Sequence, residues 1–285
     1  MNLKLPWSAK ASQKAMNSIF ILSGVITLVI LLVILSYILI KGLPVINFDF
    51  IFSNPIDSGE KGGIFPMIVS SIYMTFVAVV IATPIGIGSA IYMSEYAKNQ
   101  KIINAVRFGS EILASVPSII FGLFGLAFFV IFLNLGWSIL SGALVLALMS
   151  IPTIYQVAES TLSSIPNSCK EGAYGLGATK WQVICEIIIP MALPGIITGV
   201  ILAITRAISE AAAVMYAVGA SLSVPITLFD PGRPLPLHLY MLATEGISLS
   251  NAYGTAAVLV IIVLGLTILT NYIVERYQKR ISGEI

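Results

Sequence analysis

The sequence predicts an all-α integral membrane protein, because it is far too apolar for a water-exposed surface. Of its 285 residues, 58% are hydrophobic and only 10% are charged, and the mean hydropathy is +0.99. Soluble domains usually carry about 25% charged residues. Backbone groups inside lipid must find hydrogen-bond partners within their own span, so helices are the expected element. No stretch is left over for a soluble domain of useful size.

Long runs without charge give the number of spans. A helix needs roughly 20 residues to cross the hydrocarbon core. The uncharged run from Ile112 to Ala158 would be roughly 70 Å long as a single helix. We expect it to fold back at Asn134–Ser138, where turn-forming residues gather. The six transmembrane helices predicted in this way are 17–41, 64–93, 108–133, 138–158, 190–218 and 252–274.

The first apolar run follows a basic segment, as the core of a signal peptide does. The run from Ala15 to Ile40 is longer than such a core, and no small-residue cleavage site follows it. We therefore expect a retained first span at 17–41, preceded by an N-terminal segment at 1–16.

Lysine and arginine predict the orientation, because they are enriched in cytoplasmic loops. With the N-terminus in the cytoplasm, eleven of them lie inside and three outside. The inside residues are Lys4, Lys10, Lys14, Lys98, Lys101, Arg107, Lys170, Lys180, Arg276, Lys279 and Arg280, and the outside residues are Lys41, Lys61 and Arg233. We expect a bacterial-type cytoplasmic membrane protein whose N-terminus and tail (275–285) are both cytoplasmic.

The longest hydrophilic region outside is the stretch from Ala220 to Asn251. Its prolines disfavour regular helix. His238, the only histidine, lies in this stretch, where a role as a pH sensor or metal ligand is not favoured.

A polar loop at 166–190 is predicted to form a helix–turn–helix at the membrane surface. Ser168 and Glu171 have the spacing of a capping box, and Gly175 and Gly177 can end the first helix. A second helix would place Trp181, Ile184, Cys185 and Ile188 on one apolar face, opposite Thr179, Gln182 and Glu186, and Pro190 and Pro194 would mark the start of the next span. Such a loop could dock a partner, or it could simply anchor two spans.

The spacing in this loop resembles the EAA loop, E-A-A-x3-G-x9-I-x-L-P, of ATP-binding-cassette (ABC) importer permeases. The matching residues are Glu171, Gly172, Ala173 and Gly177, followed by Ile187–Pro190, with Gly172 in place of the first alanine. The resemblance implies a type I (MetI-like) permease fold at 64–274 and a separate ATPase that grips this loop. The chain has no Gly-Lys dipeptide, hence no P-loop. It is therefore not expected to be an enzyme itself.

Two charges lie inside the fifth predicted span. Arg206 would be roughly 16 Å deep if the span enters the hydrocarbon near Gly195. Glu210 is four residues further on and would share its helix face. The pair could be a structural lock between helices. Alternatively, it could relay an oxyanion, since guanidinium binds phosphate through two parallel hydrogen bonds. Ser209, Thr205 and Ser160 could add neutral donors, although such hydroxyls often bond their own helix backbone.

The chain also resembles the narrower family of PstA-type membrane subunits of bacterial phosphate ABC importers. The matching segments are Gly62–Ala97, Ser115–Gly125, Glu171–Gly199 and Arg206–Glu210. That family has R-A-x-G-E-T at the last site, where this chain has Ser209 and Ala211 in place of the glycine and the threonine. The related PstC-type permeases share similar motifs.

The resemblance implies a full set of partners. They are a second related permease that forms a heterodimer with this chain, two copies of an ABC ATPase that uses ATP and Mg, and an extracytoplasmic phosphate-binding protein. No cofactor, metal ligand, catalytic residue or nucleic-acid partner is expected in this chain. A PstC-type permease, a permease for another oxyanion and a stand-alone secondary transporter are the alternatives.

Overall fold

A computed structural model describes residues 9–281, so Lys4 and the outermost parts of both terminal segments lie outside the described residues. The helical elements are α1 (Ala9–Gly42), η1 (Leu43–Val45), α2 (Phe48–Phe52), η2 (Asp57–Gly59), α3 (Phe65–Ile91), η3 (Tyr92–Tyr96), α4 (Gln100–Ser115), α5 (Ser118–Gly125), η4 (Leu126–Phe132), α6 (Ile139–Ser163), α7 (Asn167–Gly175), α8 (Lys180–Gln182), η5 (Val183–Ile188), α9 (Ile189–Ile208), α10 (Leu235–Thr244) and α11 (Leu249–Ile281). Two short strands, β1 (Pro55–Ile56) and β2 (Lys61–Gly62), pair antiparallel.

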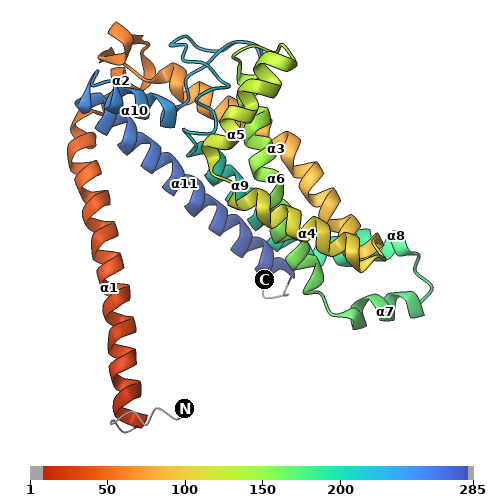
Figure 1. The fold of residues 1–285 in the computed structure, drawn as a ribbon. Coiled ribbons are helices and arrows are strands. Elements are labelled where there is room, and N and C mark those ends of the chain that lie inside the picture. Colours follow the sequence, from red (N-terminus) through yellow and green to blue (C-terminus); the bar gives the residue numbers. More distant parts are fainter. Residues whose placement is uncertain (1–8, 282–285) are drawn as a thin grey trace, which may run out of the picture.

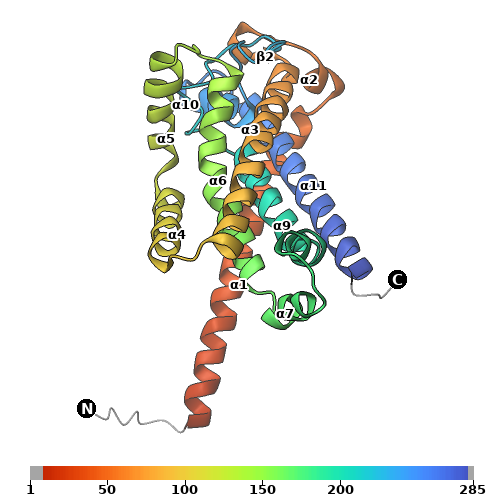
Figure 2. The ribbon, with the colours of Figure 1, turned by 90° about the vertical axis from the view of Figure 1, so that its right-hand side faces the viewer.

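Among the described residues, five helices are long and apolar enough to cross a membrane, and a bent helix pair makes up to six. The chain runs back and forth between two ends of the molecule, which we call the α7 end and the α10 end after the helices located there (Figure 1). Helix α1 begins, and α11 finishes, on the side of the α7 end (Figures 1 and 2). The predicted all-α membrane architecture is confirmed.

The third predicted span, 108–133, is not one straight helix. Helices α4 and α5 meet at an angle of 95°, with the break at Val116 and Pro117. Proline has no N–H to donate and pushes the residue before it out of the helical conformation, and Val116 has the extended ψ of 130°. The bend therefore gives α5 a direction of its own, and its Phe121, Gly122 and Gly125 are buried against the bundle.

The fifth predicted span, 190–218, was placed too far toward the α10 end, because α9 ends at Ile208. The following residues form turns although they are rich in alanine. Ala213, Val214, Ala217 and Val218 are nonetheless almost completely buried. Gly122 of α5 closely approaches the carbonyl groups of Ala212 and Ala213. This packing against α5 overrides the helix propensity of the sequence.

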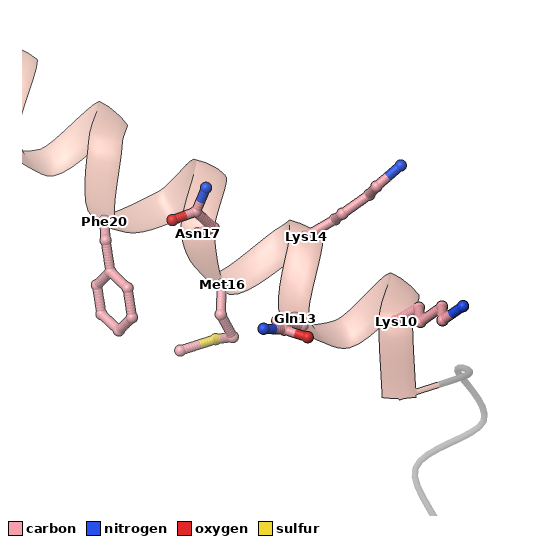
Figure 3. Close-up of a pocket in the computed structure, with 6 residues that line it drawn as sticks. All are labelled: Lys10, Gln13, Lys14, Met16, Asn17 and Phe20. Carbon is pink, nitrogen blue, oxygen red and sulfur yellow. The ribbon is translucent and has the colours of Figure 1, made fainter.

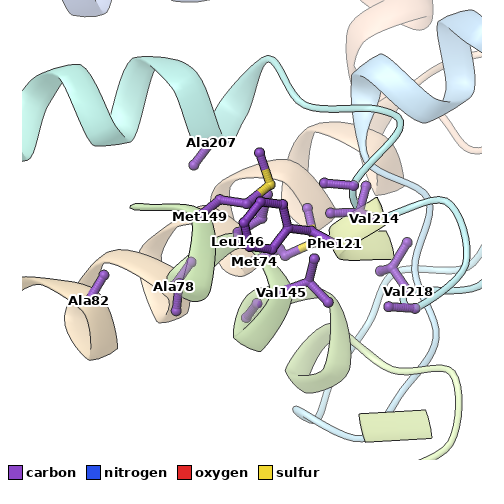
Figure 4. Close-up of a cluster of buried hydrophobic side chains, with 14 of the residues drawn as sticks. Met74, Ala78, Ala82, Phe121, Val145, Leu146, Met149, Ala207, Val214 and Val218 are labelled. Carbon is purple, nitrogen blue, oxygen red and sulfur yellow. The ribbon is translucent and has the colours of Figure 1, made fainter. Parts of the chain in front are cut away.

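The main core lies where α3, α5, α6, α9 and the segment after α9 meet. Its buried side chains include Met74, Ala78, Ala82, Phe121, Val145, Leu146, Met149, Ala207, Val214 and Val218 (Figure 4). Small residues let the helices come close: Gly86 of α3 contacts Ile154 of α6, and Gly199 of α9 contacts Val157. Close packing of this kind is the main source of helix association in lipid.

Helix α1 stands largely apart from this bundle (Figures 1 and 2). It is a helix throughout the predicted first span, and none of its most apolar window is buried. Its C-terminal end packs against α11, where Gly42 touches Tyr253 and Ala257 and the Tyr37 ring meets the Tyr253 ring edge to face. The two helices are therefore joined at the α10 end.

The proline-rich stretch at the α10 end contains one regular helix, contrary to the sequence-based expectation. Helix α10 begins at Leu235, with Pro236 in its first turn. Proline is tolerated there because the first N–H groups of a helix have no partner within it. The segment from Gly232 to His238 is buried, so this stretch is part of the packed fold.

We predict that Gly42→Leu lowers the thermal stability of the purified protein in detergent, because the added side chain would collide with Tyr253 and Ala257. Overpacking of this kind costs about 1–3 kcal/mol. Gly24→Leu is the matched control, since Gly24 lies on the same helix with nothing within 4 Å. Equal melting temperatures for the two variants would contradict the packing of α1 on α11.

Candidate functional site

The loop at the α7 end has the predicted helix–turn–helix form, with different caps. Helix α7 begins at Asn167 after Pro166, and no side chain caps it, so the predicted capping box of Ser168 and Glu171 is wrong. Ser168 already lies in the first helical turn. The observed capping box belongs to Thr179 and Gln182 at the start of α8. As predicted, α7 ends at Gly175, and Gly177 has a φ of +86°, which suits glycine.

The residues that match the EAA loop form a projecting surface. Glu171 and Gly172 are exposed, and nothing lies within 4 Å of the positions where Gly172 and Gly177 would carry a side chain. Leu176 is 92% exposed. Ala173 is buried against Val183 and Ile184. The loop is thus anchored from beneath by Ala173, while its outer face is free.

The second helix of this loop buries a different face from the one predicted. Ile184 and Ile188 are buried as expected, but Trp181 is 66% exposed and Val183 is fully buried instead. The segment from Val183 to Ile188 is a π-helix, whose wider turn rotates the residues before it relative to an α-helix. Pro190 and Pro194 lie inside one continuous helical stretch from Lys180 to Ile208.

Arg206 and Glu210 lie at the other end of that stretch. The Arg206 Nε atom is 3.8 Å from Glu210 Oε1, and the two side chains are 38% and 17% exposed. They do not share a helix face as predicted, because α9 ends at Ile208 and Glu210 follows the C-cap, Ser209. The turn that ends the helix brings them together. A cation in the last turn also interacts favourably with the helix dipole.

The bend between α4 and α5 adds a residue that the sequence did not point to. The Ser118 hydroxyl, in the first turn of α5, lies beside the Glu210 carboxylate. Unpaired N–H groups at a helix N-terminus favour negative charge. Pro117 was the available signal for this arrangement, because a proline inside an apolar run marks a break.

The neutral donors proposed from the sequence have mixed outcomes. The Ser209 hydroxyl donates a 2.9 Å hydrogen bond to the Thr205 carbonyl oxygen, as hydroxyls in membrane helices often do. Thr205 is adjacent to Arg206 along the chain, and Ser209 follows three residues later. Ser160 is exposed near the end of α6 that leads to α7.

Two long-range ion pairs were not found from the sequence. Arg107 of α4 contacts Glu159 of α6, with 2.6 Å between Nη2 and Oε1. Lys170 of α7 contacts Glu95 of η3, also at 2.6 Å. The partners are far apart along the chain, so no local pattern indicates them. Both pairs lie toward the α7 end and tie the connecting segments to the bundle.

At the α10 end, His238 is completely buried. Burial, followed by the nearby positive charge of Arg233, lowers the pKa of His238 to about 4. The imidazole is therefore neutral at physiological pH.

A surface hollow runs along the first turns of α1. It is lined by Lys10, Gln13, Lys14, Met16, Asn17 and Phe20 (Figure 3). All six side chains come from one helix, so they enclose nothing, and this hollow is not a candidate site.

We predict opposite effects for alanine at two glycines of the loop. Gly172→Ala should stabilise α7 by up to about 1 kcal/mol, because Gly172 lies within the helix and has open space around it. Gly177→Ala should cost about 1–2 kcal/mol, because its φ is positive. Hydrogen exchange of residues 167–178 measures both changes. Equal protection in the two variants would contradict the backbone geometry of the turn.

A family model described as "Binding-protein-dependent transport system inner membrane component" matches residues 82–283. Among curated relatives, the "Probable ABC transporter permease protein YqgI" of Bacillus subtilis is 33% identical over 96% of this chain and 99% of its own. The "Phosphate transport system permease protein PstA" of Haemophilus influenzae is 32% identical over 94% of this chain and 95% of its own.

Solved structures show the same fold at low sequence identity. A bacterial ABC transporter involved in the import of alginate gives a TM-score of 0.65, with 15% identity over 94% of this chain and 99% of its own. The MetNI methionine ABC transporter gives 0.61, with 21% identity over 73% of this chain and 93% of its own. The chain therefore belongs to the family of binding-protein-dependent transport system inner membrane components: it is a multi-pass inner-membrane permease subunit of an ABC importer and resembles the PstA-type permeases.

Proposed function

We propose that this subunit translocates inorganic phosphate. The observation that carries the proposal is the Arg206–Glu210 pair, whose 3.8 Å separation leaves the guanidinium with donors to spare. A charge within a membrane span is costly unless it faces a partner or water. The names of PstA relatives, several of which are about 30% identical to the chain, support phosphate as the substrate.

Arg206 can act as a relay because its contact with Glu210 is loose. Phosphate offers oxygen atoms that match the guanidinium in a two-bond arrangement. While phosphate is bound, Glu210 can keep the Ser118 hydroxyl as a neighbour. When phosphate leaves, Glu210 again balances the charge of Arg206. Arg206 can thus bind an anion and still release it, as transport requires.

The partly exposed position of Arg206 supports a pathway at the edge of this chain. With 38% of its side chain accessible, Arg206 can face a second subunit as well as its own bundle. We therefore propose a heterodimer with a related permease, so that the pathway lies between the two. An extracytoplasmic phosphate-binding protein would deliver the substrate at the α10 end.

The α7 loop is proposed as the docking site for the ATPase. Glu171, Gly172, Ala173 and Gly177 form its exposed turn and anchoring contact. Two copies of the ATPase, with ATP and Mg, would supply the energy. This assignment places the α7 end and both termini in the cytoplasm, which agrees with the excess of lysine and arginine in the inside segments.

A permease for another oxyanion is the second candidate. Ser209 and Ala211 stand where PstA-type sequences have glycine and threonine, which alters the surroundings of the same cation. Arg206 could bind any tetrahedral oxyanion. Measuring whether sulfate or arsenate competes with phosphate uptake therefore separates a phosphate permease from a permease for another oxyanion.

We predict that Arg206→Ala reduces phosphate uptake in assembled complexes by at least about 100-fold, because the anion loses the charged donor that this chain supplies to the proposed site. Arg206→Lys should retain part of the activity, since it keeps the charge without the planar two-bond geometry. Radiolabelled phosphate uptake measures both.

The matched control is Arg276→Ala, which removes an exposed arginine near the end of α11. It should leave uptake unchanged. Normal uptake by an assembled Arg206→Ala complex would reject the relay.

We predict that Leu176→Cys crosslinks to the ATPase subunit, because Leu176 is the most exposed large apolar side chain among the described residues and lies in the turn between α7 and α8. Ile226→Cys is the control, since Ile226 is 85% exposed but precedes α10 on the opposite end. Crosslinking of both cysteines, or only of Ile226→Cys, would argue against docking at the α7 loop.

Uptake that continues after ATPase inactivation would favour a secondary transporter.

A further inference from the structure

We propose that Glu95 is a positioning residue that fastens the α7 loop to α3, so that movement of the docked ATPase is passed to α3 as well as to α9. The inference rests on the proposed docking of the ATPase at this loop. It concerns a residue outside the EAA-like segment. Glu95 lies in η3, the π-helical extension of α3.

The first contact is a buried ion pair. Lys170 Nζ lies 2.6 Å from Glu95 Oε1, with side chains only 17% and 6% exposed. The Ser94 hydroxyl also donates to Glu95 Oε1, at 3.3 Å. Exposed pairs contribute little, whereas removing one partner of a buried pair leaves an uncompensated charge. The exposed Lys61–Asp57 pair at the α10 end serves as the comparison for this buried pair.

The second contact comes from the other side of the turn. Lys180, at the start of α8, donates a hydrogen bond to the Glu95 carbonyl oxygen. Its ammonium group also lies 4.5 Å from the centre of the Tyr96 ring. Carbonyl groups at a helix end lack partners within the helix, and a lysine is a suitable donor for them. Tyr92 stacks on Tyr96 and supports that ring.

Together the two lysines bracket the exposed turn. Lys170 directly precedes Glu171, and Lys180 follows the turn at Gly177. Both reach the same residue of η3. The turn is therefore tied at each of its ends to a single point on the α3 extension. Apolar contacts reinforce this tie, since Ala90 of α3 is buried in one cluster with Ala173 and Ile184.

The connection leads from the loop to the core that supports Arg206. Helix α8 continues through η5 into α9, which is one route. Helix α3 is the other, because Ala78 and Ala82 lie in the same buried cluster as Ala207, next to Arg206 (Figure 4). A force on α7 that moved α9 alone would shear this cluster. Fastening the loop to α3 lets both helices move as one body.

The test measures phosphate taken up per ATP hydrolysed by the reconstituted complete importer. For Glu95→Ala we expect normal crosslinking of Leu176→Cys to the ATPase and retained ATP hydrolysis. Uptake per ATP should fall by at least about fivefold, in the usual range of coupling between sites. A purely architectural role would lower assembly and hydrolysis without changing this ratio.

Two further variants distinguish a loss of coupling from misfolding. Lys170→Met removes the same ion pair from the loop side and should lower the ratio similarly. The double exchange Glu95→Lys with Lys170→Glu restores opposite charges and should recover much of the coupling. Asp57→Asn, which removes the exposed pair with Lys61, is the matched control and should leave the ratio unchanged.

An unchanged ratio in assembled Glu95→Ala or Lys170→Met complexes would overturn the proposal. So would a double exchange that assembles but stays uncoupled. Failure of the proposed function looks different, because the unaltered importer would then show no ATP-dependent phosphate uptake, or its Leu176→Cys form would not crosslink to the ATPase.

Discussion

The close packing of α3, α6 and α9 is the constraint on which the rest of the structure depends. The three helices meet with little space between them, because glycines leave room for side chains of the facing helix. Gly86 packs against Ile154, Gly199 against Val157, and Gly195 against Thr161. In lipid, such contacts must replace the hydrophobic effect as the source of association. This packing fixes where α9 lies and where it ends, and it thereby fixes the position of Arg206.

The irregular segment after α9 depends on the same packing. Non-helical backbone at membrane depth is tolerated only where protein or water covers it. Here α5 and α6 cover it: the Ser138 N–H donates to the Ala217 carbonyl oxygen, and Gly122 lies against the carbonyl groups of Ala212 and Ala213. The bend at Pro117 makes this possible, because α5 runs at 95° to α4 and places Gly122 against this segment. The break in the third span and the early end of α9 therefore depend on the same packing of α5 against the segment after α9.

Polar contacts at the α7 end have a different character. They join segments rather than form a core: Arg107 joins α4 to α6, and Lys170 and Lys180 join the loop to η3. Where such a contact is shielded from water, as at Glu95, removing one partner is costly because the other charge is left unpaired. The exposed turn that they hold is left without contacts of its own, which is what a surface for docking needs.

Charge, hydropathy and short spacings along the chain were enough to predict the membrane class, a fold of five to six apolar spans, the projecting loop and the proximity of Arg206 to Glu210. These properties follow from local composition and from short spacings, because lipid leaves the backbone few choices. Tertiary structure alone decided the bend that places Ser118 beside Glu210, the end of α9 at Ile208, the burial of Val183 in place of Trp181, and the partners of Glu95. Each of these depends on packing between distant segments, whose free energy outweighs local propensity and leaves no trace in the spacing of neighbouring residues.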